Sequence, residues 1–196
     1  MTFAMADAIL RYQTELMPAP ALKVEESRKI RGLKIITPDI FYDFRGEYVE
    51  TFNARRYRFV DPEGRAVEFV ADDVSVSRRG VLRGLHGDAK TWKLIQCVHG
   101  EIYLVIADMR EHSDTYLKWE GFAMNGRNRI QVLVPAGCGT GHLCLSDVCV
   151  FSYKQSEYYA GPAEQFTVRW DDPKLNIYWP TQDPVLSRRD SDAPWL

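Results

Sequence analysis

The sequence lacks the marks of several common protein classes. It has four cysteines among 196 residues, and no two of them form a CxxC pair or a zinc-like spacing with histidine. No apolar run is long enough to cross a membrane. The formal net charge is −2, which gives no overall positive field for nucleic acid. We therefore expect no nucleic-acid or membrane partner, and any anionic ligand must be held by local arginines and lysines.

The start of the chain also lacks a secretory signal, because Asp7, Arg11 and Glu15 interrupt its apolar residues. Cysteines without a pairing pattern are typical of a reducing compartment. We expect a cytoplasmic protein whose buried cysteines stay reduced: Cys97, Cys138, Cys144 and Cys149.

What is present predicts a globular fold, since 45% of the residues are hydrophobic and 12% are aromatic. From residue 30 onward, short β-type runs alternate with turn residues. Many short strands at near-regular spacing predict an all-β sandwich or barrel. The expected strands cover residues 33–37, 47–52, 66–70, 74–77, 81–85, 93–98, 101–108, 129–135, 142–145, 148–155 and 164–170.

The N-terminal residues have a different pattern. Residues 3–17 carry apolar side chains at roughly helical spacing, and Pro18 and Pro20 end that pattern. We therefore predict an N-terminal extension over residues 1–29, a helix followed by a linker, and one β domain over residues 30–196. Within that domain, the segment around His99-Gly100 is predicted to form a hairpin.

Residues 81–94, VLRGLHGDAKTWKL, bring Arg83, His86 and Lys93 together in a β context. Arg83 and His86 are three positions apart, so on a regular strand they would face opposite sides unless a bend near Gly84 or Gly87 re-aims one of them. By spacing alone, a surface histidine among charges is the more common case. The functional alternative is a general base, because histidine titrates near neutral pH.

A histidine base needs a carboxylate behind it, and spacing does not select one. Six candidates compete: Asp72, Asp73, Asp88, Asp171, Asp172 and Asp190. The four histidines form no compact His-x-His pair, so no metal is expected. We expect no organic cofactor either. Tyr153 lies in the expected strand 148–155, and Tyr158 and Tyr159 follow it. Tyrosines in strands usually serve in packing. Their functional alternative is a proton-donating phenol or a ring that stacks on a nucleotide base.

Several motifs, in order, resemble the nucleotide-sugar 3,5-epimerase family, typified by dTDP-4-dehydrorhamnose 3,5-epimerase. They span about residues 30–192 and are DFRGEYVETF (43–52), GVLRGLH (80–86), KLIQCVHGEIYLVIADMR (93–110), VPAGCGTGH (134–142), YKQSEYY (153–159), WDDPKLNIYWP (170–180) and LSRRD (186–190). The resemblance implies a cupin-type β jelly roll, or double-stranded β-helix, that forms a homodimer by exchanging N-terminal strands.

The resemblance also implies roles for individual residues. His86 would abstract a proton next to the C4 ketone, Asp190 would support it, Lys93 would stabilise the enolate oxygen, and Tyr153 would reprotonate the opposite face. A base and an acid on opposite faces are what inversion requires, and the cation lowers the barrier by favouring the enolate. The substrate-binding residues it implies are Arg45, Glu50, Arg83 for the diphosphate, Tyr158 or Tyr159 near the base, Arg189 and His142.

The sequence departs from the family on the substrate side. The loop between His86 and Lys93 is shorter than usual, and the family's PxGFAHGF segment becomes PAGCGTGH, with Thr140 at its histidine and His142 two places on. The variant HGDAKTWKL resembles a subgroup associated with GDP-linked 6-deoxyheptose epimerases. We therefore predict an epimerase of deoxysugar and polysaccharide biosynthesis that inverts C3, C5 or both in a dTDP- or GDP-linked 4-keto-6-deoxy sugar.

Two other functions remain open. A 3,4-ketoisomerase of the same fold would move the ketone from C4 to C3 by shuttling a proton on one face, so a tyrosine opposite His86 argues against it. A non-catalytic nucleotide-sugar-binding cupin would be favoured by loss of His86 or Asp190, and both residues are present.

Overall fold

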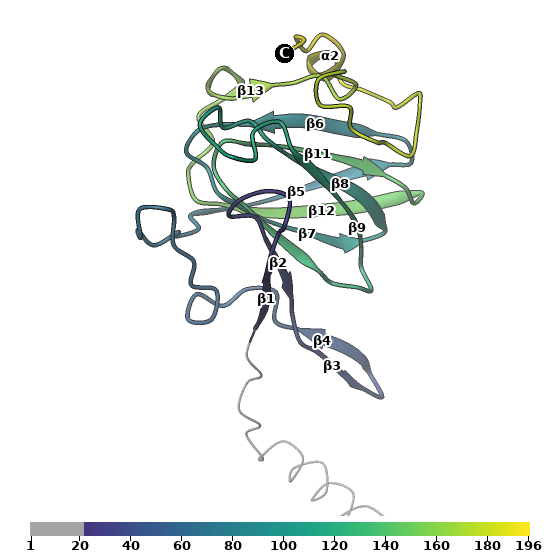
Figure 1. Ribbon diagram of the computed structural model, residues 1–196. Helices are drawn as coiled ribbons and strands as arrows, with labels where there is room; N and C mark the ends of the chain where they lie inside the picture. The colour runs from purple at the N-terminus through teal and green to yellow at the C-terminus, as the bar shows by residue number, and fades with distance from the viewer. Residues whose placement is uncertain (1–21) are drawn as a thin grey trace, which may run out of the picture.

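The computed structural model describes residues 22–196, so the predicted helix at residues 3–17 lies outside the described part. Two antiparallel sheets pack face to face as a sandwich (Figure 1). In spatial order, the six-stranded sheet contains β1 (Lys23–Glu26), β2 (Lys34–Thr37), β10 (Gln131–Val134), β7 (Lys93–His99), β12 (Val148–Gln155) and β5 (Ala71–Arg78).

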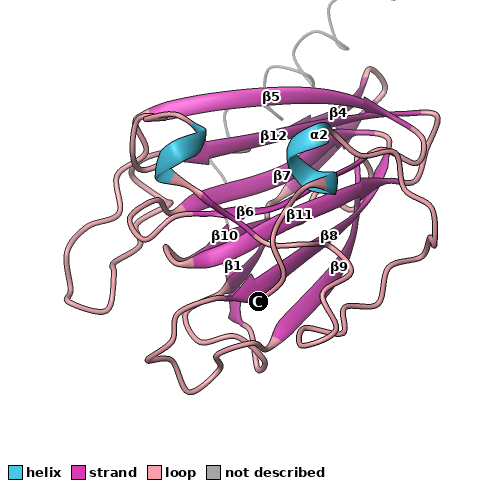
Figure 2. Ribbon diagram, turned by 90° about the horizontal axis from the view of Figure 1, so that it is seen from above, coloured by secondary structure: helices cyan, strands magenta, loops and turns pink. Residues whose placement is uncertain are grey.

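The second sheet has five strands. In spatial order they are β13 (Phe166–Thr167), β6 (Leu82–Gly87), β11 (Cys138–Cys144), β8 (Glu101–Asp108) and β9 (Trp119–Asn125). A separate hairpin, β3 (Ile40–Asp43) with β4 (Gly46–Val49), projects from the sandwich (Figure 1). Two short helices, η1 (Pro162–Glu164) and α2 (Arg188–Ser191), lie in front of the strands in the view of Figure 2.

The sheets bury apolar residues on both faces, which explains the nearly continuous apolar runs in the sequence. In β8, Ile102, Leu104 and Ile106 face the other sheet, whereas Val105 and Ala107 pack under the C-terminal segment. The loop before β5 covers the outer face of the six-stranded sheet with Tyr57, Phe59 and Val67, which pack against Ile36, Leu94 and Leu133. The all-β jelly-roll prediction is confirmed.

Four details differ from the sequence prediction. The hairpin at His99-Gly100 is wrong, because β7 and β8 belong to different sheets and the chain crosses between the sheets at Gly100, whose φ is +76°. Residues 66–70 form no strand: Ala66 makes only an isolated bridge with Val60, and Val67 and Phe69 pack on the outer face of the six-stranded sheet. The expected linker contains β1, which pairs with β2. The sequence analysis also missed β3 and β9.

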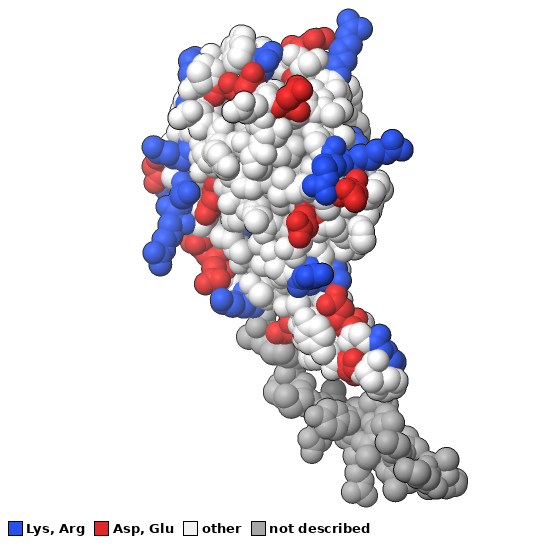
Figure 3. Space-filling model, turned by 90° about the vertical axis from the view of Figure 1, so that its right-hand side faces the viewer, with Lys and Arg blue, Asp and Glu red and all other residues white. Residues whose placement is uncertain are grey.

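Other expectations concern the whole surface and the thiols. All four cysteines are buried and free, as predicted. Acidic and basic side chains are interspersed over the described face shown in Figure 3. Within residues 22–196, no helix is long and apolar enough to cross a membrane.

Candidate active site

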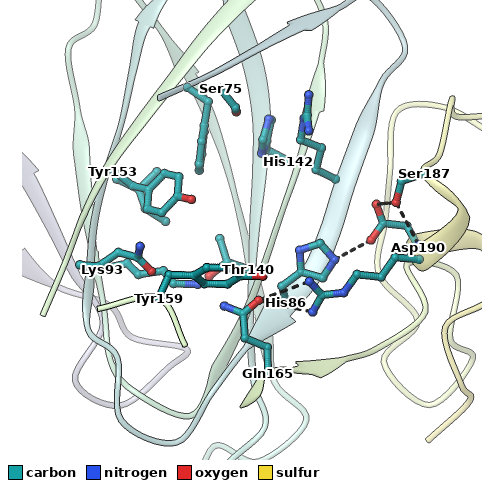
Figure 4. Close-up of a pocket in the computed structure, with 15 residues that line it drawn as sticks. Ser75, His86, Lys93, Thr140, His142, Tyr153, Tyr159, Gln165, Ser187 and Asp190 are labelled. Carbon is teal, nitrogen blue, oxygen red and sulfur yellow. Dashed lines mark hydrogen bonds and ion pairs between the residues drawn. The ribbon is translucent and has the colours of Figure 1, made fainter. Parts of the chain in front are cut away.

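A cavity of about 290 Å³ opens between the two sheets (Figure 4). Each sheet supplies one wall, and the C-terminal segment closes the mouth. The wall from the six-stranded sheet contains Ser75, Lys93, Ile95, Phe151, Tyr153 and Gln155. The wall from the five-stranded sheet contains Arg83, His86, Thr140 and His142, and the mouth contains Tyr159, Gln165, Ser187, Arg189 and Asp190.

An irregularity in β6 allows both Arg83 and His86 to line the cavity. On the neighbouring strand β11, Thr140 pairs with His86 and His142 pairs with Arg83, so two steps on β11 match three on β6. Gly84 lies at this irregularity with φ +123°, and a Cβ there would approach the Cα of Gly141 to 2.5 Å. The predicted bend near Gly84 is therefore present, and it turns both side chains to one face.

His86 forms a short hydrogen bond with Asp190: the distance from His86 Nε2 to Asp190 Oδ1 is 2.6 Å. Among the six candidate aspartates, Asp190 is the one that contacts this ring within the described residues. Asp190 is 2% exposed. Burial alone would raise its pKa, but hydrogen bonds from His86 and Ser187 outweigh that effect, and the pKa of Asp190 is lowered. The carboxylate is therefore ionised at neutral pH.

Local structure fixes this carboxylate. Ser187 is the N-cap of α2 and accepts a hydrogen bond from the backbone N–H of Asp190. The Ser187 hydroxyl in turn donates to Asp190 Oδ2 at 2.7 Å. Since an ionised carboxylate only accepts hydrogen bonds, Nε2 of His86 carries a proton in this pair. In the neutral form of the ring, the lone pair is then on the other nitrogen, Nδ1, which lies on the cavity side (Figure 4).

Lys93 and Tyr153 lie on the opposite wall (Figure 4). Neither side chain has a hydrogen-bond or ion-pair partner among residues 22–196. Burial lowers the pKa of Lys93, nearby Arg189 lowers it further, and Asp88 opposes the shift. Burial raises the pKa of Tyr153, with Asp73 and Tyr159 adding to the effect. The phenol is therefore protonated at neutral pH.

The cavity carries an excess of positive charge. Arg83, Lys93 and Arg189 line it, whereas Asp190 is its one lining carboxylate in the described part of the chain. Arg83 is oriented by a hydrogen bond of 3.0 Å from its Nε to Ser77 Oγ. Arg189 donates from Nε to Thr167 Oγ1 at 3.0 Å. Oriented guanidinium groups suit an anionic, phosphate-bearing ligand.

Three residues named in the sequence analysis do not line this cavity. Arg45 lies at the tip of the β3–β4 hairpin and pairs with Asp43. Glu50 follows β4 and pairs with Arg56. Tyr158 lines a neighbouring cavity of about 280 Å³, which shares the wall residues Gln155, Tyr159 and Gln165 with the first.

Sequence reasoning gave no role to Ser75, Gln165 or Ser187, and it noted Thr140 only as a departure from the family. Ser187 carried a usable signal, because a serine three residues before an acidic residue resembles a helix-capping pattern. Ser75 and Gln165 carried none, since isolated polar residues occur in many strands and loops. Within residues 22–196, no group of three or more His, Cys, Asp or Glu side chains could hold a metal ion.

A jelly roll with an aspartate-supported histidine between its sheets, facing a buried lysine and a partly buried tyrosine, defines a cupin suited to proton transfer. A sequence model described as dTDP-4-dehydrorhamnose 3,5-epimerase matches residues 27–196. The chain belongs to this family of sugar epimerases.

Named relatives agree with this membership. The dTDP-4-dehydrorhamnose 3,5-epimerase of Shigella flexneri is 39% identical over 83% of this chain and 90% of its own. The crystal structure of dTDP-6-deoxy-D-glucose-3,5-epimerase from Legionella pneumophila, in complex with dTDP-4-keto-L-rhamnose, is similar with a TM-score of 0.81 and 37% identity, covering 89% of this chain and 92% of that one. A 3′-monoepimerase from Streptomyces bikiniensis, in complex with dTDP-quinovose, has a TM-score of 0.79 and 32% identity, covering 87% of each chain.

Proposed function

We propose that this protein inverts C3, C5 or both in a nucleotide-linked 4-keto-6-deoxy sugar, with His86 as the base and Tyr153 as the acid. The observation that carries the proposal is the position of these two side chains on opposite walls of one cavity. A sugar ring between the walls would expose one face to the imidazole and the other to the phenol. The relatives that bind dTDP-linked sugars support a nucleotide-sugar substrate.

The reaction follows from the acidity of carbons next to a ketone. Nδ1 of His86 takes the proton, and the electron pair of the C–H bond moves onto the C4 oxygen to give an enolate. The resulting imidazolium is stabilised by Asp190, and the ammonium group of Lys93 stabilises the enolate oxygen. The Tyr153 hydroxyl then donates its proton to the opposite face of the carbon. Each such proton-transfer group contributes typically about 10²–10⁴-fold.

The remaining positive groups are assigned to the nucleotide. Arg83 contacts the diphosphate, Arg189 assists at the mouth, and Tyr158 or Tyr159 stacks near the base. Exposed aromatic residues on the β3–β4 hairpin support a homodimer: Phe41, Tyr42, Phe44 and Tyr48 are between 49% and 91% exposed. In such a dimer the hairpin would bring Arg45 and Glu50 to the substrate site of the second subunit.

Deuterium incorporation tests the proposal directly. The protein is incubated in D₂O with dTDP- and GDP-linked 4-keto-6-deoxyhexoses and with a GDP-linked 4-keto-6-deoxyheptose, and NMR follows C3 and C5. Exchange at one or both carbons identifies the inverted centres, and the preferred donor identifies the nucleotide. A product with its ketone at C3 would instead indicate the isomerase.

Two variants assign the base and the acid. His86→Asn should abolish exchange at every position, whereas Tyr153→Phe should retain some exchange at C3 but impair inversion. His112→Asn is the matched control, because His112 is exposed and outside the cavity. Full activity in His86→Asn would exclude this mechanism.

A further inference from the structure

The cavity wall contains polar atoms that have no partner in the protein. Four buried side-chain atoms lack a hydrogen bond among the described residues, and three of them belong to residues lining this one cavity: Ser75 Oγ, Thr140 Oγ1 and His142 Nε2. Buried polar groups in native proteins nearly always have partners, so three exceptions at one site need an explanation. A ligand that supplies the missing hydrogen bonds is one.

His142 is the most constrained of the three. It is 3% exposed and stacks on Phe151, with ring centroids 4.0 Å apart and an interplanar angle of 8°. Burial lowers the pKa of His142 to about 3, and the charges of Arg83 and His86 act in the same direction. The ring is therefore neutral at any ordinary pH. All three atoms consequently belong to uncharged groups, which suit hydroxyls better than phosphate oxygens.

Strand register orders these atoms along the cavity. Thr140 pairs with His86 across β6 and β11, and His142 pairs with Arg83. Residues directly opposite on an antiparallel pair share a face. Ser75 pairs with Phe151 on the other wall, and His142 stacks on that same ring. Thr140 is thus beside the proposed base, whereas His142 and Ser75 are beside the proposed diphosphate contact.

We propose that Ser75, Thr140 and His142 form a hydroxyl-binding wall that fixes the sugar ring, with His142 and Ser75 at the C2 hydroxyl and Thr140 at the C3 hydroxyl. This inference depends on the proposed function, which puts the C1 diphosphate at Arg83 and C3 at His86. The order of ring carbons from C1 to C3 then matches the order of the wall residues. These three are specificity and positioning residues, and none transfers a proton.

Binding of substrate analogues that lack the ketone tests the wall without relying on turnover. The probes are dTDP- and GDP-linked 6-deoxyglucose, the corresponding 2-deoxy and 3-deoxy sugars, and each nucleoside diphosphate alone, all titrated calorimetrically into the full-length protein. Loss of one hydrogen bond of ordinary strength is worth roughly tenfold in Kd. The wild type should therefore bind the complete sugar about tenfold more tightly than either deoxy sugar.

The variants should lose this discrimination selectively. His142→Phe keeps an aromatic ring against Phe151, and it should lose most of the discrimination between the complete sugar and the 2-deoxy sugar, with the remainder due to Ser75. Thr140→Val should bind the complete sugar and the 3-deoxy sugar equally well. Affinity for the nucleoside diphosphate alone should be unchanged in both. Ser75→Ala should weaken discrimination at C2, and Ser152→Ala is its matched control, a buried serine of β12 that does not line the cavity.

Thermal unfolding of the ligand-free protein gives a second readout. Replacing an unpartnered polar group with an apolar one removes a desolvation cost, so His142→Phe should unfold at a higher temperature than the wild type. Unchanged discrimination between the sugars in folded His142→Phe and Thr140→Val would overturn the wall alone. If the wild type binds no nucleotide sugar of either donor, the proposed function fails and the wall fails with it.

Discussion

The two walls of the cavity differ in how firmly their reactive groups are held. On the five-stranded side, His86 is fixed by Asp190, and Asp190 is fixed by Ser187 and the first turn of α2. On the six-stranded side, Lys93 is buried and Tyr153 is partly buried, and neither side chain has a polar partner in the described part of the chain. The proposed base is therefore preorganised by the protein, whereas the proposed cation and the proposed acid retain unused hydrogen-bonding capacity for a substrate.

Because of this difference, substitutions in the two walls should have opposite effects on the free energy of unfolding. Removing one partner of a well-paired buried carboxylate lowers the free energy of unfolding of the protein. A buried ammonium group without a partner is itself a cost, which an apolar replacement relieves. Variants of the two walls should therefore change activity in the same direction and stability in opposite directions.

Among the variants that compare the supports of the two walls, Lys93→Met should give the largest effect on kcat. Removal of a donor to a developing oxyanion typically reduces kcat about 10²–10³-fold, and the thioether should raise the free energy of unfolding because it replaces a desolvated charge. Steady-state kinetics and urea unfolding measure both quantities. Lys29→Met is the control, since Lys29 is exposed. A variant that is both inactive and less stable would show that Lys93 supports the fold rather than the enolate.

Asp190→Asn should reduce kcat somewhat less. A hydrogen bond to a charged group contributes about 1.5–3 kcal/mol, which corresponds to roughly 10–200-fold in rate. This variant should also be less stable than the wild type at neutral pH, in contrast to Lys93→Met.

Asp192→Asn is the matched control for that change, because Asp192 is exposed and pairs with Arg188 at the end of α2. Ser187→Ala should reproduce the Asp190→Asn phenotype in weaker form, since it removes the hydroxyl that supports the carboxylate. Equal kcat values for Asp190→Asn and the wild type would mean that the base is not preorganised by this pair.

Sequence reasoning was strongest where local rules apply. The strand pattern predicted the sandwich. The three-residue spacing of Arg83 and His86 showed that a bend near Gly84 or Gly87 would be needed to bring them to one face, and the structure has an irregularity at Gly84. It was weakest for contacts between distant segments. His86 and Asp190 are 104 positions apart, so spacing could not choose among six aspartates, and only the family resemblance singled out Asp190.

The predicted hairpin pairing of residues 93–98 with residues 101–108 failed for a related reason. Two apolar runs joined by a His-Gly turn are typical of a hairpin, yet β7 and β8 separate because each pairs with later strands. Local pattern records which residues are extended but not which partners they have. The sequence could not predict the unpartnered atoms of Ser75, Thr140 and His142 either. A missing hydrogen bond depends on all the segments that surround an atom in the fold, not on its own strand.

The smallest expected effect is on the pH dependence of kcat. It distinguishes Lys93 from Tyr153, the two groups on the six-stranded side of the cavity. Lys93 must be protonated to stabilise an enolate, and its pKa is lowered from the ordinary value of 10.5. Tyr153 must also be protonated, but its pKa is raised above 10.0. The alkaline fall in kcat should therefore follow Lys93, and Lys93→Arg should retain activity to higher pH because a guanidinium does not deprotonate in this range.

Stability should move the other way over the same interval. Between the lowered pKa of folded Lys93 and the ordinary value of the unfolded chain, the unfolded state binds more protons. The free energy of unfolding contributed by this residue therefore rises with pH. In the wild type, kcat should fall with rising pH while the contribution of Lys93 to the free energy of unfolding increases. Lys93→Met should lack that increase. An alkaline limb that stays in place in Lys93→Arg would assign it to Tyr153 and would remove the reason for treating the lysine as the enolate-stabilising cation.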